Sequence, residues 1–166
     1  QYVVKEINAQ LIKFDTKRSA YYTKNTQIYL KKLDLLDATV RAQILQIPES
    51  QRLLITSHDA FGYYGDAYNI EVKGLQGIST LSEYGLKDLA IMNDLIIDRK
   101  IKSVFVETSI SERAIKSLVD GVNERGYAVK IGGSLYSDAM GDFGSPQGTY
   151  IGMVESNTET IVKALK

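Results

Sequence analysis

The sequence contains no cysteine and only one histidine among its 166 residues. The absence of cysteine excludes zinc ribbons, thiol catalysis and disulfide frameworks. A metal phosphohydrolase needs several histidines, so a single His-Asp pair does not favour that class. The phosphate-binding pattern GxxxxGK(S/T) and the serine-hydrolase pattern GxSxG are both missing as well. The sequence therefore offers little support for the common classes of enzyme.

An excess of charge and a long apolar run are also missing. Twenty basic residues balance twenty acidic ones, which argues against nucleic acid as a partner. No apolar run reaches the roughly 18 residues that a membrane-spanning helix needs. Because the first residues already belong to a helical pattern, we expect that the chain continues a longer protein.

Residues 1–50 are predicted to form a helical segment. Apolar residues at spacings of three and four predict one helix over residues 2–14 and a second over residues 21–46. The second helix, with 26 residues, would be about 39 Å long. This is more than a domain of this size requires, so we expect the helix to brace a larger structure.

Residues 51–166 alternate between strand and helix patterns and are predicted to form an α/β domain. The expected strands are residues 52–57, 70–75, 103–108 and 128–135, and the expected helices are residues 60–68, 82–99, 112–125 and 149–165. Ser82 is the expected N-cap of the second helix, Ser109 and Glu112 resemble a capping box, and Gly126 follows the third helix as a C-terminal glycine. Such alternation predicts a small four-stranded parallel sheet with helices on both faces.

The candidate functional residues follow two of these strands. His58 comes directly after an apolar run, in the segment ITSHDAFGYYGDAY, and Asp138 follows a later strand in the segment YSDAMGD. The carboxyl ends of parallel strands meet at one sheet edge, where open α/β folds bind their ligands. An imidazole and a carboxylate at one edge suit a divalent metal ion. A lone histidine is nevertheless more often structural, and Asp138 also fits a turn or cap.

Four neighbouring residues have more than one interpretation each. Asp59 fits either the N-cap of the next helix or an acceptor that fixes the tautomer of His58. Glu107, at the end of the third strand, fits a partner behind the ligands, a group at an interface or a solvated carboxylate. Phe61 and Tyr136 fit ordinary packing or a wall that keeps water from an ion.

The motifs resemble one family. The stretches RLLITSHDAFGYYGDAY, IKSVFVETS, LYSDAMGD and GTYIGMVESNTETIVKAL, in this order, are similar to the C-terminal lobe and linking helix of TroA-like zinc and manganese solute-binding proteins of ABC importers. This resemblance spans nearly the whole chain. It implies a bilobed receptor with four metal ligands, two from each lobe. His58 and Asp138 match the two ligands of the C-terminal lobe.

The resemblance implies an extracytoplasmic receptor, periplasmic or anchored as a lipoprotein, that delivers Zn²⁺ or Mn²⁺ to a membrane permease without catalysis. The family's first two ligands are histidines of the N-terminal lobe, and this chain has no second histidine. We therefore expect half a site, with weak or no metal binding by this chain alone, and self-association through the surface made for the other lobe. A surface adhesion module and, less favoured, a metallohydrolase are the alternatives.

Overall fold

A computed structural model describes residues 1–76 and 86–166 of the chain. The chain divides into two compact units, Gln1–Val40 and Arg41–Lys166. The boundary at residue 50 that the sequence suggested stays a prediction. No helix in the described part of the chain is both long and apolar enough to cross a membrane.

The first unit consists of two helices joined by a short turn. Helix α1 covers Tyr2–Phe14, a 3₁₀ turn covers Thr16–Arg18, and α2 begins at Ser19 and ends at Ile44. Both predicted helices are therefore present, and the second starts and ends two residues earlier than expected. None of the residues of α1, all of which the structure describes, is buried. Its apolar stripe, which includes Val3, Ile7 and Phe14, is exposed.

The second unit contains the strand–helix alternation predicted from the sequence. In order, its main elements are β1 (Leu53–His58), α3 (Gly62–Tyr68), β2 (Glu71–Gln76), α4 (Leu86–Asp98), β3 (Ser103–Glu107), α5 (Arg113–Glu124), β4 (Lys130–Leu135) and α6 (Tyr150–Leu165). Short 3₁₀ turns at Glu49–Gln51 and Pro146–Gly148 precede β1 and α6. The expected N-cap Ser82 lies outside the described residues.

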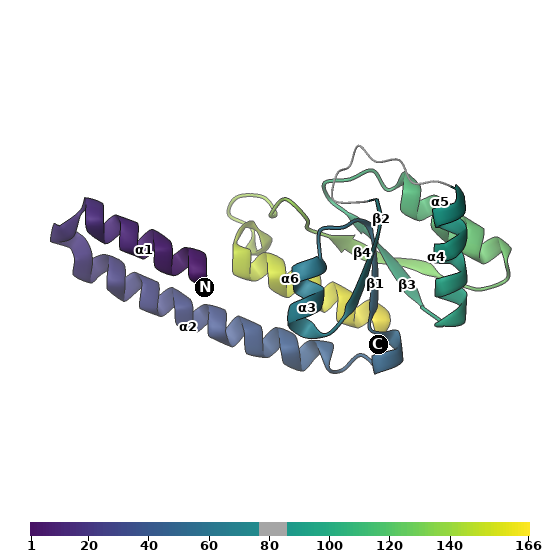
Figure 1. Ribbon diagram of the computed structural model, residues 1–166, viewed down its shortest axis with the longest axis horizontal. Coiled ribbons are helices and arrows are strands. Elements are labelled where there is room, and N and C mark those ends of the chain that lie inside the picture. Colours follow the sequence, from purple (N-terminus) through teal and green to yellow (C-terminus); the bar gives the residue numbers. More distant parts are fainter. Residues whose placement is uncertain (77–85) are drawn as a thin grey trace. The chain divides into compact units, whose positions relative to one another are not determined.

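All four predicted strands are present, and their pairing is parallel. β1 pairs with β2, and β3 pairs with β4. β1 and β3 lie next to each other in the middle (Figure 1), which gives the spatial order β2-β1-β3-β4. No backbone ladder joins these two strands within the described residues. At their carboxyl ends the backbone N–H of His58 instead donates a hydrogen bond to the side chain of Glu107.

Helices cover both faces of the sheet. α4 and α5 lie on one face and α6 on the other (Figure 1). The core on the α4–α5 side contains Leu53 and Ile55 of β1 and Val104 and Val106 of β3. Because side chains alternate along a strand, the side chains at positions 56 and 58 of β1, and at 105 and 107 of β3, face α6. The strand pattern thus puts His58 and Glu107 on the same face.

Of the two predictions for the ends of α5, the one for the C-terminal end is confirmed and the one for the N-terminal end is wrong. Gly126 has φ +83° and follows the helix as expected. The capping box is wrong, because Glu112 stands at the N-cap and makes no side-chain cap bond in the structure. The hydroxyl of Ser109 instead lies 2.9 Å from that of Ser137, in the segment after β4. A long-range contact has replaced the local one.

Gly132 marks an irregularity of β4 that lets α6 approach the sheet. Val104 pairs with Ile131 and Phe105 pairs with Gly133, so Gly132 is the extra residue of a bulge. A Cβ atom on Gly132 would lie 2.6 Å from the Cβ of Ala164 and 2.9 Å from that of Ser103. The helix can lie this close only because residue 132 has no side chain.

We predict that Gly132→Ala lowers the free energy of unfolding. The added methyl group would overpack the contact between β4 and α6, a change that typically costs about 1–3 kcal/mol. Urea unfolding followed by circular dichroism measures the difference. Gly62→Ala in α3 is the control, because its Cβ would meet nothing closer than 3.8 Å. An equal effect of the two substitutions would contradict the prediction.

Candidate functional site

The candidate site lies where the order of the strands reverses. The chain runs from β1 outward to β2 and then returns to β3 on the other side of β1. Open α/β sheets bind ligands in the crevice beyond the carboxyl ends of the strands at such a point. His58 ends β1, Glu107 ends β3, and Asp138 follows β4 by three residues. The topology therefore brings residues from three distant segments to one place.

The imidazole of His58 lies between two carboxylates. Its Nε2 atom is 3.0 Å from Oδ2 of Asp138, and its Nδ1 atom is 2.7 Å from Oε2 of Glu107. The backbone N–H of His58 donates to Oε1 of Glu107 at 2.9 Å. The contact of Nδ1 with Oε2 is close but poorly aligned as a hydrogen bond, and both atoms are buried without another partner. Glu107 thus holds His58 by its backbone and faces its ring.

This arrangement determines which ring nitrogen can bind a metal ion. A neutral imidazole carries one proton. With that proton on Nδ1, facing Glu107, the lone pair of Nε2 is free on the side of Asp138. A ligating histidine commonly donates its other N–H to a carboxylate in this way. Only a nitrogen without a proton can coordinate a cation, so this tautomer leaves Nε2 as the nitrogen able to do so.

Asp138 differs from the other two residues in exposure and in backbone conformation. The side chains of His58 and Glu107 are almost fully buried, whereas that of Asp138 is 67% exposed. Asp138 also has φ +54°, a left-handed conformation that is uncommon outside glycine but tolerated by aspartate. The preceding residue, Ser137, is buried and contacts Ser109. The carboxylate is therefore open to solvent, on a backbone that is held on its N-terminal side.

Asp59 takes neither of the two positions expected from the sequence. It is exposed, and Phe61, not Asp59, precedes α3, where no side-chain cap bond is present in the described structure. The ring of His58 faces Glu107 and Asp138 instead. The carboxylate beside the imidazole comes from a neighbouring strand and not from the next residue in the chain.

The two aromatic residues expected near the site differ in burial. Phe61 is buried and its ring meets that of Tyr64 edge-on, with centroids 6.4 Å apart. Tyr136 is half-buried, and its backbone N–H and carbonyl are both bonded to the side chain of Asn157. That either ring shields a metal ion stays a prediction.

Gly74 allows the backbone beyond β1 to pass close to β2, and the sequence analysis missed it. A Cβ atom on this residue would lie 2.6 Å from the carbonyl carbon of His58 and 2.6 Å from the backbone nitrogen of Asp59. Both contacts are with backbone, which yields less readily than a side chain. A single glycine inside a strand pattern signals such a close approach.

A hydrogen bond links α3, next to the site, to α6. The hydroxyl of Thr158 donates to the carbonyl of Val154 at 2.8 Å, so its contact of 2.9 Å with Tyr64 places the tyrosine as donor. Burial raises the pKa of Tyr64 to about 12, although the bond to Thr158 opposes this rise. Tyr64 therefore keeps its proton, and the link between the helices, throughout the physiological pH range.

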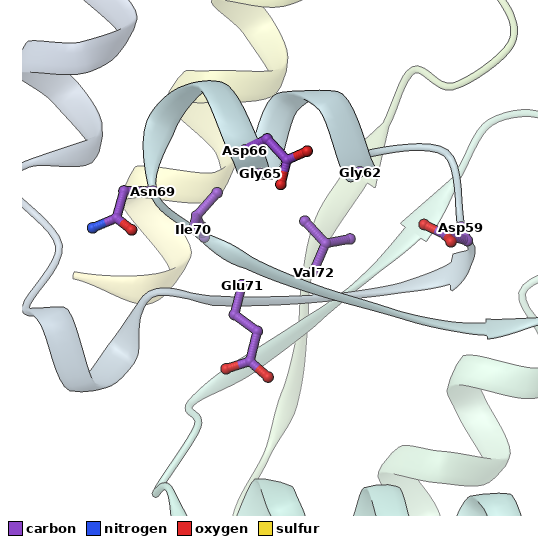
Figure 2. A pocket seen from close by; sticks show the side chains of 8 residues that line it. All are labelled: Asp59, Gly62, Gly65, Asp66, Asn69, Ile70, Glu71 and Val72. Atoms are coloured by element: carbon purple, nitrogen blue, oxygen red, sulfur yellow. The ribbon is translucent and has the colours of Figure 1, made fainter.

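A pocket between α3 and β2 is lined by none of the candidate metal ligands (Figure 2). It extends from Asp59 to Val72 and includes the carboxylates of Asp59, Asp66 and Glu71. Figure 2 shows these three groups separated and pointing in different directions. Burial tends to raise the pKa of Glu71, but hydrogen bonds and charges of Arg99 and Lys73 outweigh it and lower that pKa. Glu71 is thus already paired, and the pocket has no converging ligand set.

The described residues contain no cluster of three or more histidine, cysteine or acidic side chains suited to hold a metal ion. His58 and Asp138 present a nitrogen and an oxygen to the same point, and Glu107 lies behind the ring. A structural zinc site has four protein ligands and a catalytic site usually has three. His58, Glu107 and Asp138 are therefore a candidate for part of a metal site at the crevice of an α/β fold.

This combination of fold and partial site is typical of a lobe of a solute-binding protein. The chain belongs to the ZnuA family, described as zinc-uptake complex component A, periplasmic, whose model matches residues 1–164. The resemblance expected from the sequence motifs is confirmed.

Two curated relatives match nearly the whole chain. The manganese-binding lipoprotein MntA of Bacillus subtilis is 49% identical over 165 residues, which is 99% of this chain and 54% of that protein. The zinc-binding protein TroA of Treponema pallidum is 46% identical over 164 residues, which is 99% of this chain and 53% of that protein. The chain thus spans about half the length of these relatives, and both are named as metal-binding proteins.

The solved structure of the periplasmic zinc-binding protein TroA from Treponema pallidum has the same fold. It superimposes with a TM-score of 0.92 at 45% identity, over 97% of this chain and 58% of that one. The α/β class expected from the sequence is therefore confirmed.

We predict that Glu107→Gln changes the tautomer of His58. The amide oxygen would keep the bond from the backbone N–H of His58, so the amide NH₂ would face Nδ1 and donate to it. The ring proton of the neutral imidazole then moves to Nε2. Nitrogen-15 NMR of the only histidine reports the two tautomers directly.

The control for this experiment is Glu112→Gln, which removes the same charge from an exposed pair with Lys116. It should leave the ring signals of His58 where they are. If Glu107→Gln leaves the tautomer ratio unchanged, Glu107 does not orient the ring.

Proposed function

We propose that this chain is part of an extracytoplasmic receptor that binds Zn²⁺ or Mn²⁺ and delivers the ion to the membrane permease of an ABC importer. The observation that carries the proposal is the meeting of His58, Glu107 and Asp138 at the reversal of strand order. Membership of the ZnuA family supports the same function. In this proposal the metal ion is cargo, and no chemical step takes place.

The donor atoms support a divalent transition metal. Zn²⁺ binds imidazole nitrogen at about 2.0–2.1 Å and carboxylate oxygen at about 2.0–2.2 Å. Mn²⁺ accepts carboxylate and imidazole as well. The names of the relatives support both ions, because one is called manganese-binding and the other zinc-binding. We propose His58 and Asp138 as two ligands and Glu107 as the partner that orients His58.

The remaining ligands of the proposed site come from outside this chain. Two ligands do not complete a zinc site, and the chain corresponds to about half of its relatives. We propose that a second lobe supplies two further ligands across the crevice. Met140 and Phe143, on the segment after β4, are exposed apolar side chains, which supports a surface made to be covered. Without that lobe, self-association of the chain through this surface is part of the proposal.

We predict that the chain alone folds without metal and binds Zn²⁺ or Mn²⁺ only weakly. Its core consists of buried apolar side chains that pack against one another. Thermal unfolding with and without a chelator tests the first claim, and calorimetric titration with each metal tests the second. A large loss of stability on chelation, or nanomolar binding at one ion per monomer, would contradict the prediction.

In a receptor that contains both lobes, His58→Ala and Asp138→Ala should each weaken metal binding by more than about tenfold. Loss of a group that only orients a ligand commonly costs 10–100-fold, so loss of a ligand costs at least as much. Isothermal titration calorimetry measures the change, and Asp142→Ala, four residues after Asp138, is the control for the second variant. Unchanged affinity in either variant would remove that residue from the ligand set.

A further inference from the structure

Asn157, in α6, has a buried side-chain amide. Its hydrogen bonds to the backbone are with one residue, Tyr136, in the segment after β4. Only 5% of this residue is exposed. Its Oδ1 atom accepts a hydrogen bond from the backbone N–H of Tyr136, and its Nδ2 atom donates to the carbonyl of Tyr136, both at 2.9 Å. Nδ2 also lies 3.5 Å from the sulfur of Met153. If the amide were turned over, its NH₂ group would face the N–H of Tyr136 and its oxygen would face the carbonyl. The hydrogen bonds therefore fix the orientation of the amide.

The side-chain amide of Asn157 makes the hydrogen bonds to Tyr136 that the backbone of a neighbouring strand would otherwise make. In an extended chain the N–H and C=O of one residue point to one side, and those of the next residue to the other. The carbonyl of Leu135 accepts from the N–H of Thr108, on the side of β3. The polar groups of Tyr136 therefore point away from β3, where β4 has no strand neighbour among the described residues. Asn157 satisfies both of these groups.

This contact fixes the start of the segment that carries Asp138. Tyr136 is held by Asn157, and the buried hydroxyl of Ser137 lies 2.9 Å from that of Ser109. Asp138 follows immediately in the left-handed conformation. Such a conformation persists when its surroundings determine it. The two residues before Asp138 are tied to α6 and to the segment after β3, and these ties direct the carboxylate towards Nε2 of His58.

We infer that Asn157 is a positioning residue for the metal site, which sets the place of Asp138 opposite His58 through its hydrogen bonds to the backbone of Tyr136. The inference rests on the proposed function for its purpose, but the geometric claim holds for the metal-free chain. It gives α6 a role in the site, although neither proposed ligand belongs to that helix.

The test uses the 166-residue chain with Asn157→Ala and, in parallel, Asn123→Ala. Asn123 is a matched control because its Oδ1 atom accepts from the backbone N–H of Val129 at 3.0 Å, just before the other end of β4. Asn157→Asp is the second variant: it keeps the acceptor for the N–H of Tyr136 but turns an oxygen towards its carbonyl. The readouts in the metal-free chain are the ring signals of His58 and the amide signal of Asp138 in NMR spectra, together with thermal unfolding.

We expect both substitutions of Asn157 to shift or broaden the ring signals of His58 and the amide signal of Asp138. Asn123→Ala should leave them in place even where it lowers the melting temperature. The inference is overturned if the Tyr136 amide loses its protection from hydrogen exchange in Asn157→Ala while the His58 and Asp138 signals stay unchanged. It is also overturned if the Asn123 variant moves these signals as much.

A titration with Zn²⁺ alone, followed through the His58 ring signals, separates this inference from the proposed function. Where the wild-type chain responds, we expect Asn157→Ala to raise the half-saturating Zn²⁺ concentration by about tenfold, as loss of a group that orients a ligand commonly does. An unchanged midpoint counts against the inference. No response from the wild-type chain agrees with the weak or absent binding expected of half a site; the ligands are then tested in a receptor with both lobes, and the metal-free spectra decide the role of Asn157.

Discussion

The site depends on a carboxylate buried at the end of β3. Glu107 is only 3% exposed, and burying a charged group is costly unless it has partners. Both of its oxygens face His58, one at the backbone N–H and the other at the ring. The residue at the end of β1 places both its backbone N–H and a polar side-chain atom against this carboxylate. Histidine does so and still leaves a second ring nitrogen for another partner.

The same contact joins the two halves of the sheet. Within the described residues β1 pairs only with β2, and β3 pairs only with β4. The bond from His58 to Glu107 crosses between these pairs at the end where the strand order reverses. The crevice that this topology creates is thus closed at its base by a polar contact. The alternation of side chains along the strands then puts that contact on the face covered by α6, which supplies Asn157 and Thr158.

Patterns along the sequence predicted the strands, the helices and the positions of His58 and Asp138, because these depend on local periodicity and on where each strand ends. They did not decide between Asp59 and Glu107 as the partner of the imidazole. Asp59 is next to His58 in the chain, but Glu107 is 49 residues away and reaches the ring because β3 lies beside β1. The contact of Ser109 with Ser137 and the bonds of Asn157 to Tyr136 were missed for the same reason, since these partners lie 28 and 21 residues away.

The two proposed ligands are held to different degrees, and this difference suits the proposed uptake and release of an ion. His58 is buried and held by Glu107, so its ring is oriented by folding and before any cation arrives. Fixing a residue costs roughly 1–2 kcal/mol per backbone position, and a ring that is already ordered avoids that cost on binding. Asp138 is exposed, and the two residues before it and its own contact with His58 hold it in place. A cation that reaches Nε2 must take the place of the contact with Asp138, and the carboxylate is the partner that is free to adjust.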